Sequence, residues 1–166
     1  LFIVNSNICL AQKPILKSKN IGPIIIPAYK IEEAQGHLLK DYRLIVCNKK
    51  GEAIEIPFQL DEKDPYDDFI MHQGPIPNSQ FSNHIFDSQD ELSFMARDIG
   101  ENRVPDKWPF FSKPRVLYRI KITRPGEQNS VFLGVYTKNP PPLSQKKYVD
   151  FNIKKGEIST TKYFYN

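Results

Sequence analysis

Residues that favour turns punctuate this chain densely, which favours β structure over long helices. Fourteen prolines and eight glycines divide the 166 residues into short apolar runs. Eleven phenylalanines and eight tyrosines add residue types that favour strands. Residues 53–60 alternate side chains in the period of a half-buried strand, with Ile54, Ile56, Phe58 and Leu60 on the apolar face and Glu55, Pro57 and Gln59 on the solvated face. We therefore predict an all-β fold, an antiparallel β-sandwich or partly open barrel of about eight strands, with long loops at 61–86 and 98–114.

Three hairpins are expected from the positions of the turn residues. The first joins residues 42–47 to residues 53–60 through a turn in which Gly51 can adopt positive φ. The second joins 115–123 to 130–137 through a turn at Pro125 and Gly126, and the third joins 148–153 to 158–165. Residues 24–29 should form an edge strand, because Pro27 cannot donate to a ladder, and residues 91–96 a further strand.

The beginning of the chain suggests an exported protein. Within residues 1–11, residues 1–4 and 8–11 are apolar, and Cys9 and Ala11 are small residues at the −3 and −1 positions of a signal-peptide cut before Gln12. Residues 12–23 would follow as a linker, and residues 24–166 as a single β-domain, with strands expected to continue beyond Asn166. We expect a periplasmic or extracellular location. The alternative for residues 1–11 is the first strand of the mature fold.

Composition and spacing exclude several classes of function. The net charge of +4 comes without a nucleic-acid-binding module, so no nucleic-acid partner is expected. No apolar run reaches the length of a transmembrane span. The chain contains no zinc-type cysteine spacing, no Gly-rich phosphate loop and no nucleophile elbow. Cys47 is expected to be a buried free thiol, with a Cys9–Cys47 disulfide as the alternative.

Two acidic segments at strand ends contain the candidate metal ligands. The proposed ligand set is Asp61, Glu62, Asp87, Asp90 and Glu91. Ca²⁺ binds six to eight oxygens, several of them from carboxylates on loops, so Ca²⁺ is the cofactor that these residues suggest. The sequence around them does not fit an EF-hand. The alternative is solvated loop charge with local turns.

A sugar or protein ligand would use the same region. Gln59, Asp61, Glu62 and Trp108 are the candidate ligand-binding residues, and Asp98 is a further residue to test. Carbohydrate-binding domains use aromatic rings as stacking platforms, whereas aromatic side chains in long loops can also simply pin the loop to the core. Paired carboxylates could instead act as the acid and base of a glycosidase, drawn from Asp61, Glu62, Asp90 and Glu91.

The chain resembles a group of uncharacterised exported bacterial proteins. The shared pattern is PFQxDE, here residues 57–62, followed by DELxFMAxDxG, here residues 90–100. The likeness extends over about residues 40–165. The strand end at residues 58–62 is more weakly similar to N-terminal β-barrel modules of polysaccharide-degrading proteins. The resemblance implies an exported β-domain and no particular activity.

Together these features predict a non-catalytic binding module for carbohydrate or an envelope partner. The alternatives are a carbohydrate-active enzyme with paired carboxylates and a structural envelope protein without a small ligand. All the proposed sites require that the fold bring the strand end at 59–62 beside the segment 87–91.

Overall fold

The fold was obtained as a computed structural model, which describes residues 2–4, 22–72, 76–108, 113–124, 127–146, 148–152, 157–160 and 164–165. The described residues form strands and short 3-10 turns, without an α-helix. The all-β, predominantly antiparallel prediction is therefore confirmed. Cys47 is a buried free thiol, as expected.

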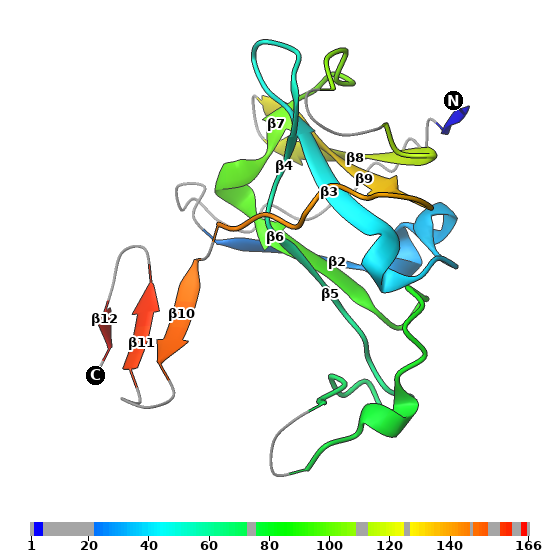
Figure 1. The fold of residues 1–166 in the computed structure, drawn as a ribbon, viewed down its shortest axis with the longest axis vertical. Helices are drawn as coiled ribbons and strands as arrows, with labels where there is room; N and C mark the ends of the chain where they lie inside the picture. The colour runs from blue at the N-terminus through cyan, green and yellow to red at the C-terminus, as the bar shows by residue number, and fades with distance from the viewer. Residues whose placement is uncertain are drawn as a thin grey trace.

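The main sheet has the strand order β1-β8-β9-β3-β4, and β7 also pairs with β9 (Figure 1). Its strands are β1 (Phe2–Val4), β3 (Tyr42–Cys47), β4 (Ala53–Glu55), β7 (Gly100–Glu101), β8 (Val116–Arg124) and β9 (Glu127–Val135). All pairs in this sheet are antiparallel except β1 with β8. Residues 2–4 of the expected signal peptide thus lie beside β8, while residues 5–21, with most of the expected linker, lie outside the described residues.

Two smaller sheets complete the structure. The second sheet has the order β2-β6-β5, with β2 (Pro23–Pro27), β5 (Phe58–Asp61) and β6 (Glu91–Met95). The third contains β10 (Val149–Asn152), β11 (Glu157–Thr160) and β12 (Phe164–Tyr165). β2 occupies an edge, as its proline predicts. The turns at 125–126 and 153–156 of the two C-terminal hairpins lie outside the described residues.

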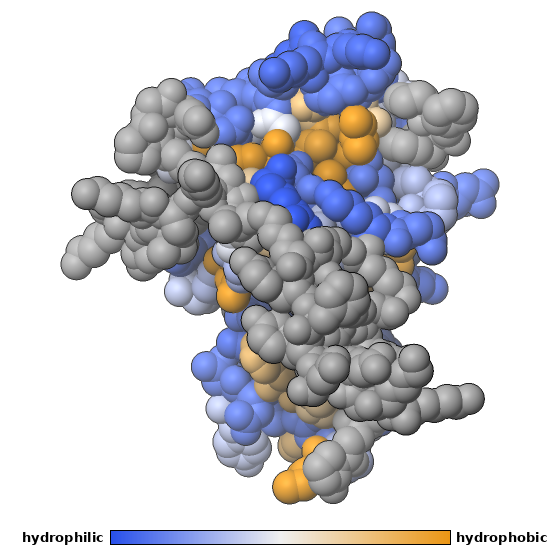
Figure 2. Space-filling model, turned by 90° about the vertical axis from the view of Figure 1, so that its left-hand side faces the viewer, coloured by the Kyte–Doolittle hydropathy of each residue, from blue (hydrophilic) through white to orange (hydrophobic). Residues whose placement is uncertain are grey.

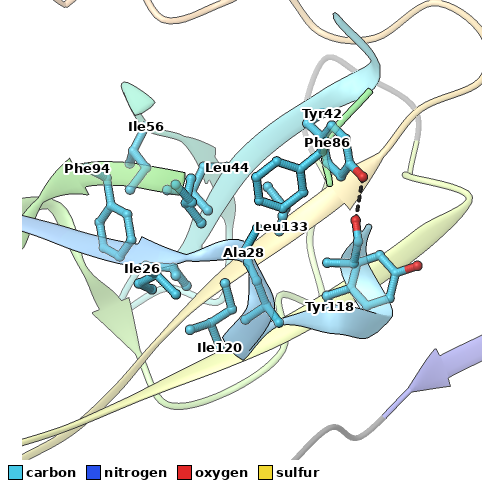
Figure 3. Packing of buried hydrophobic residues seen from close by; sticks show 14 of the residues in the cluster. Ile26, Ala28, Tyr42, Leu44, Ile56, Phe86, Phe94, Tyr118, Ile120 and Leu133 are labelled. Atoms are coloured by element: carbon cyan, nitrogen blue, oxygen red, sulfur yellow. Dashed lines mark hydrogen bonds between the residues drawn. The ribbon is translucent and has the colours of Figure 1, made fainter. Parts of the chain in front are cut away.

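The core lies between the main sheet and the second sheet. Ile26 of β2 and Phe94 of β6 face Leu44 of β3 and Leu133 of β9 across it (Figure 3). Tyr42 packs edge-to-face on Phe86 at 5.5 Å between ring centroids, and its hydroxyl donates a hydrogen bond to the carbonyl of Ala34. Burial of this apolar surface from two facing sheets is the main stabilising contribution, and it makes the fold sandwich-like.

The strand expected at 53–60 is divided between two sheets. β4 remains beside β3, and the chain then crosses at Ile56 and Pro57 to become β5 of the second sheet. The continuous strand was therefore a wrong prediction, and so was the inward position of Ile54, which is 43% exposed. Proline cannot donate to a central ladder, so the crossing at this point follows from its chemistry.

Between β5 and β6, the described residues 62–72 and 76–86 form an arm that projects from the sheets at the bottom of Figure 1. Its return is fixed at the base by main-chain hydrogen bonds, from Gly36 to the carbonyl of Phe86 and from Leu39 to the carbonyl of His84, each 2.9 Å. The Phe86 ring itself is fully buried. The arm therefore leaves and re-enters the body at fixed positions.

Candidate functional site at the base of the arm

The two acidic strand ends lie side by side. β5 and β6 pair antiparallel, and the register places Asp61 opposite Glu91 and Gln59 opposite Ser93. The predicted juxtaposition of 59–62 with 87–91 is thus confirmed. Because directly opposed residues of such a pair have neighbouring side chains, carboxylates from both segments share this edge of the sheet.

Glu62 holds the returning arm in place. One carboxylate oxygen, Oε1, accepts the N–H groups of Asn83 (3.1 Å) and His84 (2.8 Å), and the other, Oε2, accepts the Ser82 hydroxyl (2.8 Å). Its side chain is nearly buried. A carboxylate that accepts three such hydrogen bonds acts as an anchor for the arm, because three of its roughly four lone-pair sites are already engaged.

Asp90 performs the same task for the loop before β6. It is 2% exposed, and its two oxygens accept the N–H groups of Lys63 (3.1 Å) and Asp87 (2.9 Å). Burial raises the pKa of Asp90 to about 6, against these two hydrogen bonds. Asp87 in turn accepts the N–H of Gln89 at 2.9 Å, which closes a local turn.

Asp61 and Glu91 are less completely engaged. Burial, and then the charge of Glu91, raises the pKa of Asp61, while a 3.4 Å hydrogen bond from the Ser93 hydroxyl opposes the rise. Lys63 lies 3.3 Å from Glu91 and 3.0 Å from Asp67. One ammonium group thus serves two carboxylates, and Asp61 has no ion pair within the part of the chain that the structure describes.

An open depression of about 470 Å³ lies where the arm leaves β5. Its lining combines apolar and ionisable side chains from the end of β5 and from the facing stretch of the arm, namely Leu60, Asp61, Glu62, Phe69, Ile70, Met71 and His72. Two of the predicted ligand-binding residues, Asp61 and Glu62, therefore border a space that a ligand side chain or sugar ring can enter.

A serine and two histidines beside Glu62 were not singled out together by the sequence. The Ser82 hydroxyl lies 2.9 Å from Nδ1 of His84, and the His84 ring stacks on His72 at 6.2 Å between centroids. Glu62 also approaches Nδ1 of His84, at 3.7 Å. A catalytic triad needs the serine and the carboxylate on different ring nitrogens, so this arrangement does not match one. This group of side chains is brought together by the fold, so the spacing of its residues in the sequence could not have identified it.

The other predicted residues are placed as follows. Trp108 packs against the buried cluster on the opposite face of the main sheet and does not line the depression. Gln59 is exposed on β5. Asp98, just after β6, forms a 2.6 Å ion pair with Lys146. The described residues contain no group of three or more His, Cys, Asp or Glu side chains arranged to hold a metal ion. The calcium prediction thus gains no support from the geometry.

A second polar cluster was missed by the sequence analysis. Residues 137–146, the strap, cross the outer face of the main sheet, and buried Arg43 donates from Nε to the Pro141 carbonyl at 2.6 Å. Glu55 on β4 lies in the same cluster, and one of its oxygens, Oε1, has no hydrogen-bond partner among the described residues. The signal was Tyr42–Cys47 itself, an almost unbroken apolar run typical of a strand covered on both faces.

Comparison of the chain with protein-family models, with curated proteins and with solved structures finds no match. Among the described residues, no helix is long and apolar enough to cross a membrane. The class that can be stated is therefore an all-β, sandwich-like domain with a projecting arm, and its function has to be argued from the geometry.

Proposed function

We propose that this chain is a non-catalytic binding module of an exported protein, and that it engages its ligand through the arm. The primary ligand class is a protein of the cell envelope. This proposal depends on the uneven distribution of exposed large apolar side chains over the molecule.

The distribution of exposed apolar side chains carries the proposal. Eleven large hydrophobic residues are exposed in the described part of the chain, and six of them lie on the arm: Tyr66, Phe69, Met71, Ile76, Phe81 and Ile85. Ile76 is 85% and Tyr66 79% exposed. Figure 2 shows apolar patches on the lower part of the molecule among hydrophilic ones. Grouped exposed apolar residues, as opposed to scattered ones, mark interaction surfaces.

The hydrogen bonds at the arm's base support the same conclusion. Buried Asp64 accepts the N–H groups of Tyr66 (2.8 Å) and Asp68 (3.1 Å), and Asn78 donates to its other oxygen at 3.2 Å. Together with Glu62, this residue shapes the arm before any ligand arrives. A preorganised surface loses less conformational entropy on binding, which favours affinity.

Carbohydrate is the second ligand class. The observation that favours it is the depression, which Phe69 lines together with Asp61 and Glu62. An aromatic face beside hydrogen-bond acceptors suits a sugar ring. Catalysis is less favoured by the geometry, because Glu62 and Asp90 already accept main-chain hydrogen bonds and are poorly placed to exchange protons.

A pair of matched triple variants tests the proposal. The arm variant carries Tyr66→Ser, Met71→Ser and Ile76→Ser. The control variant carries Tyr29→Ser, Ile25→Ser and Ile54→Ser, and it also removes one tyrosine and two aliphatic side chains that are exposed, but from outside the arm.

Both variants and the wild type should be assayed on a panel of defined oligosaccharides and by photocrosslinking in envelope preparations. We expect the arm variant to lose the wild-type signal, the control to retain it, and both to melt within about 2 °C of the wild type, because exposed side chains contribute little to stability. Equal loss in both variants, or binding that survives in the arm variant, would refute the proposal.

A further inference from the structure

One edge of the second sheet presents main-chain groups that have no backbone partner among the described residues. β5 lies at the end of the order β2-β6-β5, so only its β6 side is paired over residues 58–61. On the other side, Ile70 donates to the Glu62 carbonyl at 2.9 Å. Alternate residues of a strand present their backbone groups to the same side, so Phe58 and Leu60 face that side as well. In the described ranges, neither has a backbone partner there.

The ladder between β5 and the arm ends at this point. Asp64 donates to the Asp68 carbonyl at 2.8 Å and Ile70 to Glu62, but the next contact of the arm is with itself, from Asn78 to the carbonyl of Met71 at 3.1 Å. Among the described residues, no backbone hydrogen bond joins the arm to β5 beyond Ile70. The depression described above opens beside Leu60, where the next pair of the ladder would have formed.

The chemistry of the depression indicates what could occupy this edge. Its apolar wall is formed by Leu60, Phe69, Ile70 and Met71. Its ionisable lining residues are Asp61, Glu62 and His72. The surrounding segment is negative, because residues 61–68 hold five carboxylates and one lysine, and that lysine is shared between Asp67 and Glu91. A complementary ligand is extended, carries alternating cationic and apolar side chains, and brings its own main-chain donors and acceptors.

We propose that the free edge of β5 adds an extended segment of a partner protein as a fourth strand, with an apolar side chain in the depression and a Lys or Arg side chain against Asp61. This inference rests on the proposed function, since it names the partner's chemistry at the base of the arm. A second copy of this chain is a poorer occupant. Two β5 edges paired about a two-fold axis would bring the acidic ends of both strands into one interface.

Three blocked seven-residue peptides serve as probes. The first alternates valine and lysine, the second has glutamate in place of lysine, and the third is the first peptide with N-methyl groups on alternate main-chain amides. The third keeps every side chain and loses the donors along one edge. Binding is measured by fluorescence anisotropy, and amide hydrogen exchange is followed by NMR.

We expect the first peptide to bind and to protect the amides of Phe58 and Leu60 from exchange, and the other two to bind at least tenfold more weakly. Asp61→Asn should weaken the first peptide about tenfold, the effect of losing one charge-assisted hydrogen bond. The matched control Asp106→Asn, on an exposed loop, should leave its affinity unchanged.

The other outcomes separate this inference from the proposed function. If N-methylation changes nothing while the arm variant abolishes binding, strand addition is wrong and the proposed function survives. If the amides of Phe58 and Leu60 are protected but the arm variant binds normally, strand addition stands and the arm loses its role. Strand addition also fails if no peptide binds at millimolar concentration, if an oligosaccharide protects the two amides and the peptide does not, or if the free protein is a dimer with both amides already protected.

Discussion

Replacing Glu55 by glutamine should make this protein more stable above neutral pH. Glu55 lies half-buried on β4 beneath the strap. Burial raises its pKa from 4.5 to about 7, against a hydrogen bond from the Ser144 N–H and the positive charge of Arg43. The folded state therefore binds the proton of this carboxyl more tightly than the unfolded state does. The same burial leaves Oε1 of Glu55 without a hydrogen-bond partner among the described residues.

Proton linkage gives the sign and the size of the effect of Glu55 on the free energy of unfolding. Between pH 4.5 and pH 7 the folded chain holds more of this proton than the unfolded chain, so rising pH lowers the free energy of unfolding. The stabilising effect is complete below pH 4.5 and is lost above about pH 7. The full difference in pKa corresponds to about 3.4 kcal/mol, at roughly 1.36 kcal/mol per unit. Water reaches the exposed half of the group, so we reduce the expected effect to about 1 to 2 kcal/mol.

Urea denaturation at pH 4.5, 6 and 8 measures this effect. Glu55→Gln should match the wild type at pH 4.5 and exceed it by about 1 to 2 kcal/mol at pH 8, because the amide resembles the neutral acid and cannot ionise. Glu33→Gln, on an exposed turn, is the control and should leave the pH profile parallel to that of the wild type. A difference between Glu55→Gln and wild type that stays constant with pH, or a less stable variant at pH 8, would refute the reasoning.

Four further outcomes are expected. Glu62→Gln should loosen the base of the arm by about 1 to 2 kcal/mol, seen as faster amide exchange at Asn83 and His84 without a change in the exchange of core amides; unchanged exchange would contradict the anchoring role. Arg43→Met should cost about 2 to 3 kcal/mol in urea denaturation, because three main-chain carbonyls lose a charged donor; a cost below about 1 kcal/mol would count against it. Tyr136→Phe should be neutral or slightly stabilising, since its buried hydroxyl has no partner among the described residues; a loss above about 1 kcal/mol would mean that the hydroxyl is bonded. Melting curves with Ca²⁺ and with EDTA should coincide, whereas a ligand at 100 times its dissociation constant adds about 2.7 kcal/mol, and a shift of that size would restore the calcium prediction.

Local turn chemistry made part of this fold predictable. The β3–β4 turn could be anticipated because Gly51 sits where the chain needs a positive φ, and its value is +82°. The edge position of β2 followed from Pro27. The convergence of Asp61 and Glu91 was also predictable as a hypothesis, because Asp61 ends one strand-like run and Glu91 begins another. Their direct pairing in one register, however, depends on which strands become neighbours, and that is decided by packing over the whole chain.

The wrong predictions have one physical origin: the sequence of a strand does not show which other segments pack over each of its faces. Ile54 pairs with Val46, whose side chain is in the core, yet Ile54 is exposed because it lies on the edge strand β4. Glu55 was assigned to a wet face and is half-buried because the strap passes over it. Alternation in a sequence shows which residues share a face of a strand. It does not show what covers that face, and the strap that covers Glu55 lies about 90 positions away in the sequence.

The acidic residues that looked most functional in the sequence are the ones that the fold uses most heavily as acceptors. Glu62 and Asp90 accept hydrogen bonds from main-chain N–H groups, and Glu62 also accepts one from the Ser82 hydroxyl, which holds residues 82–84 and 87 against the ends of β5 and β6. This fixes the arm and at the same time leaves Asp61 beside an open depression and a free strand edge. The carboxylates thus have two roles: Glu62 and Asp90 hold the arm and the loop before β6 in place, and Asp61 is the proposed contact for a ligand. Substituting the first pair should therefore release the arm from the body, whereas substituting Asp61 should change only what the arm's base can bind.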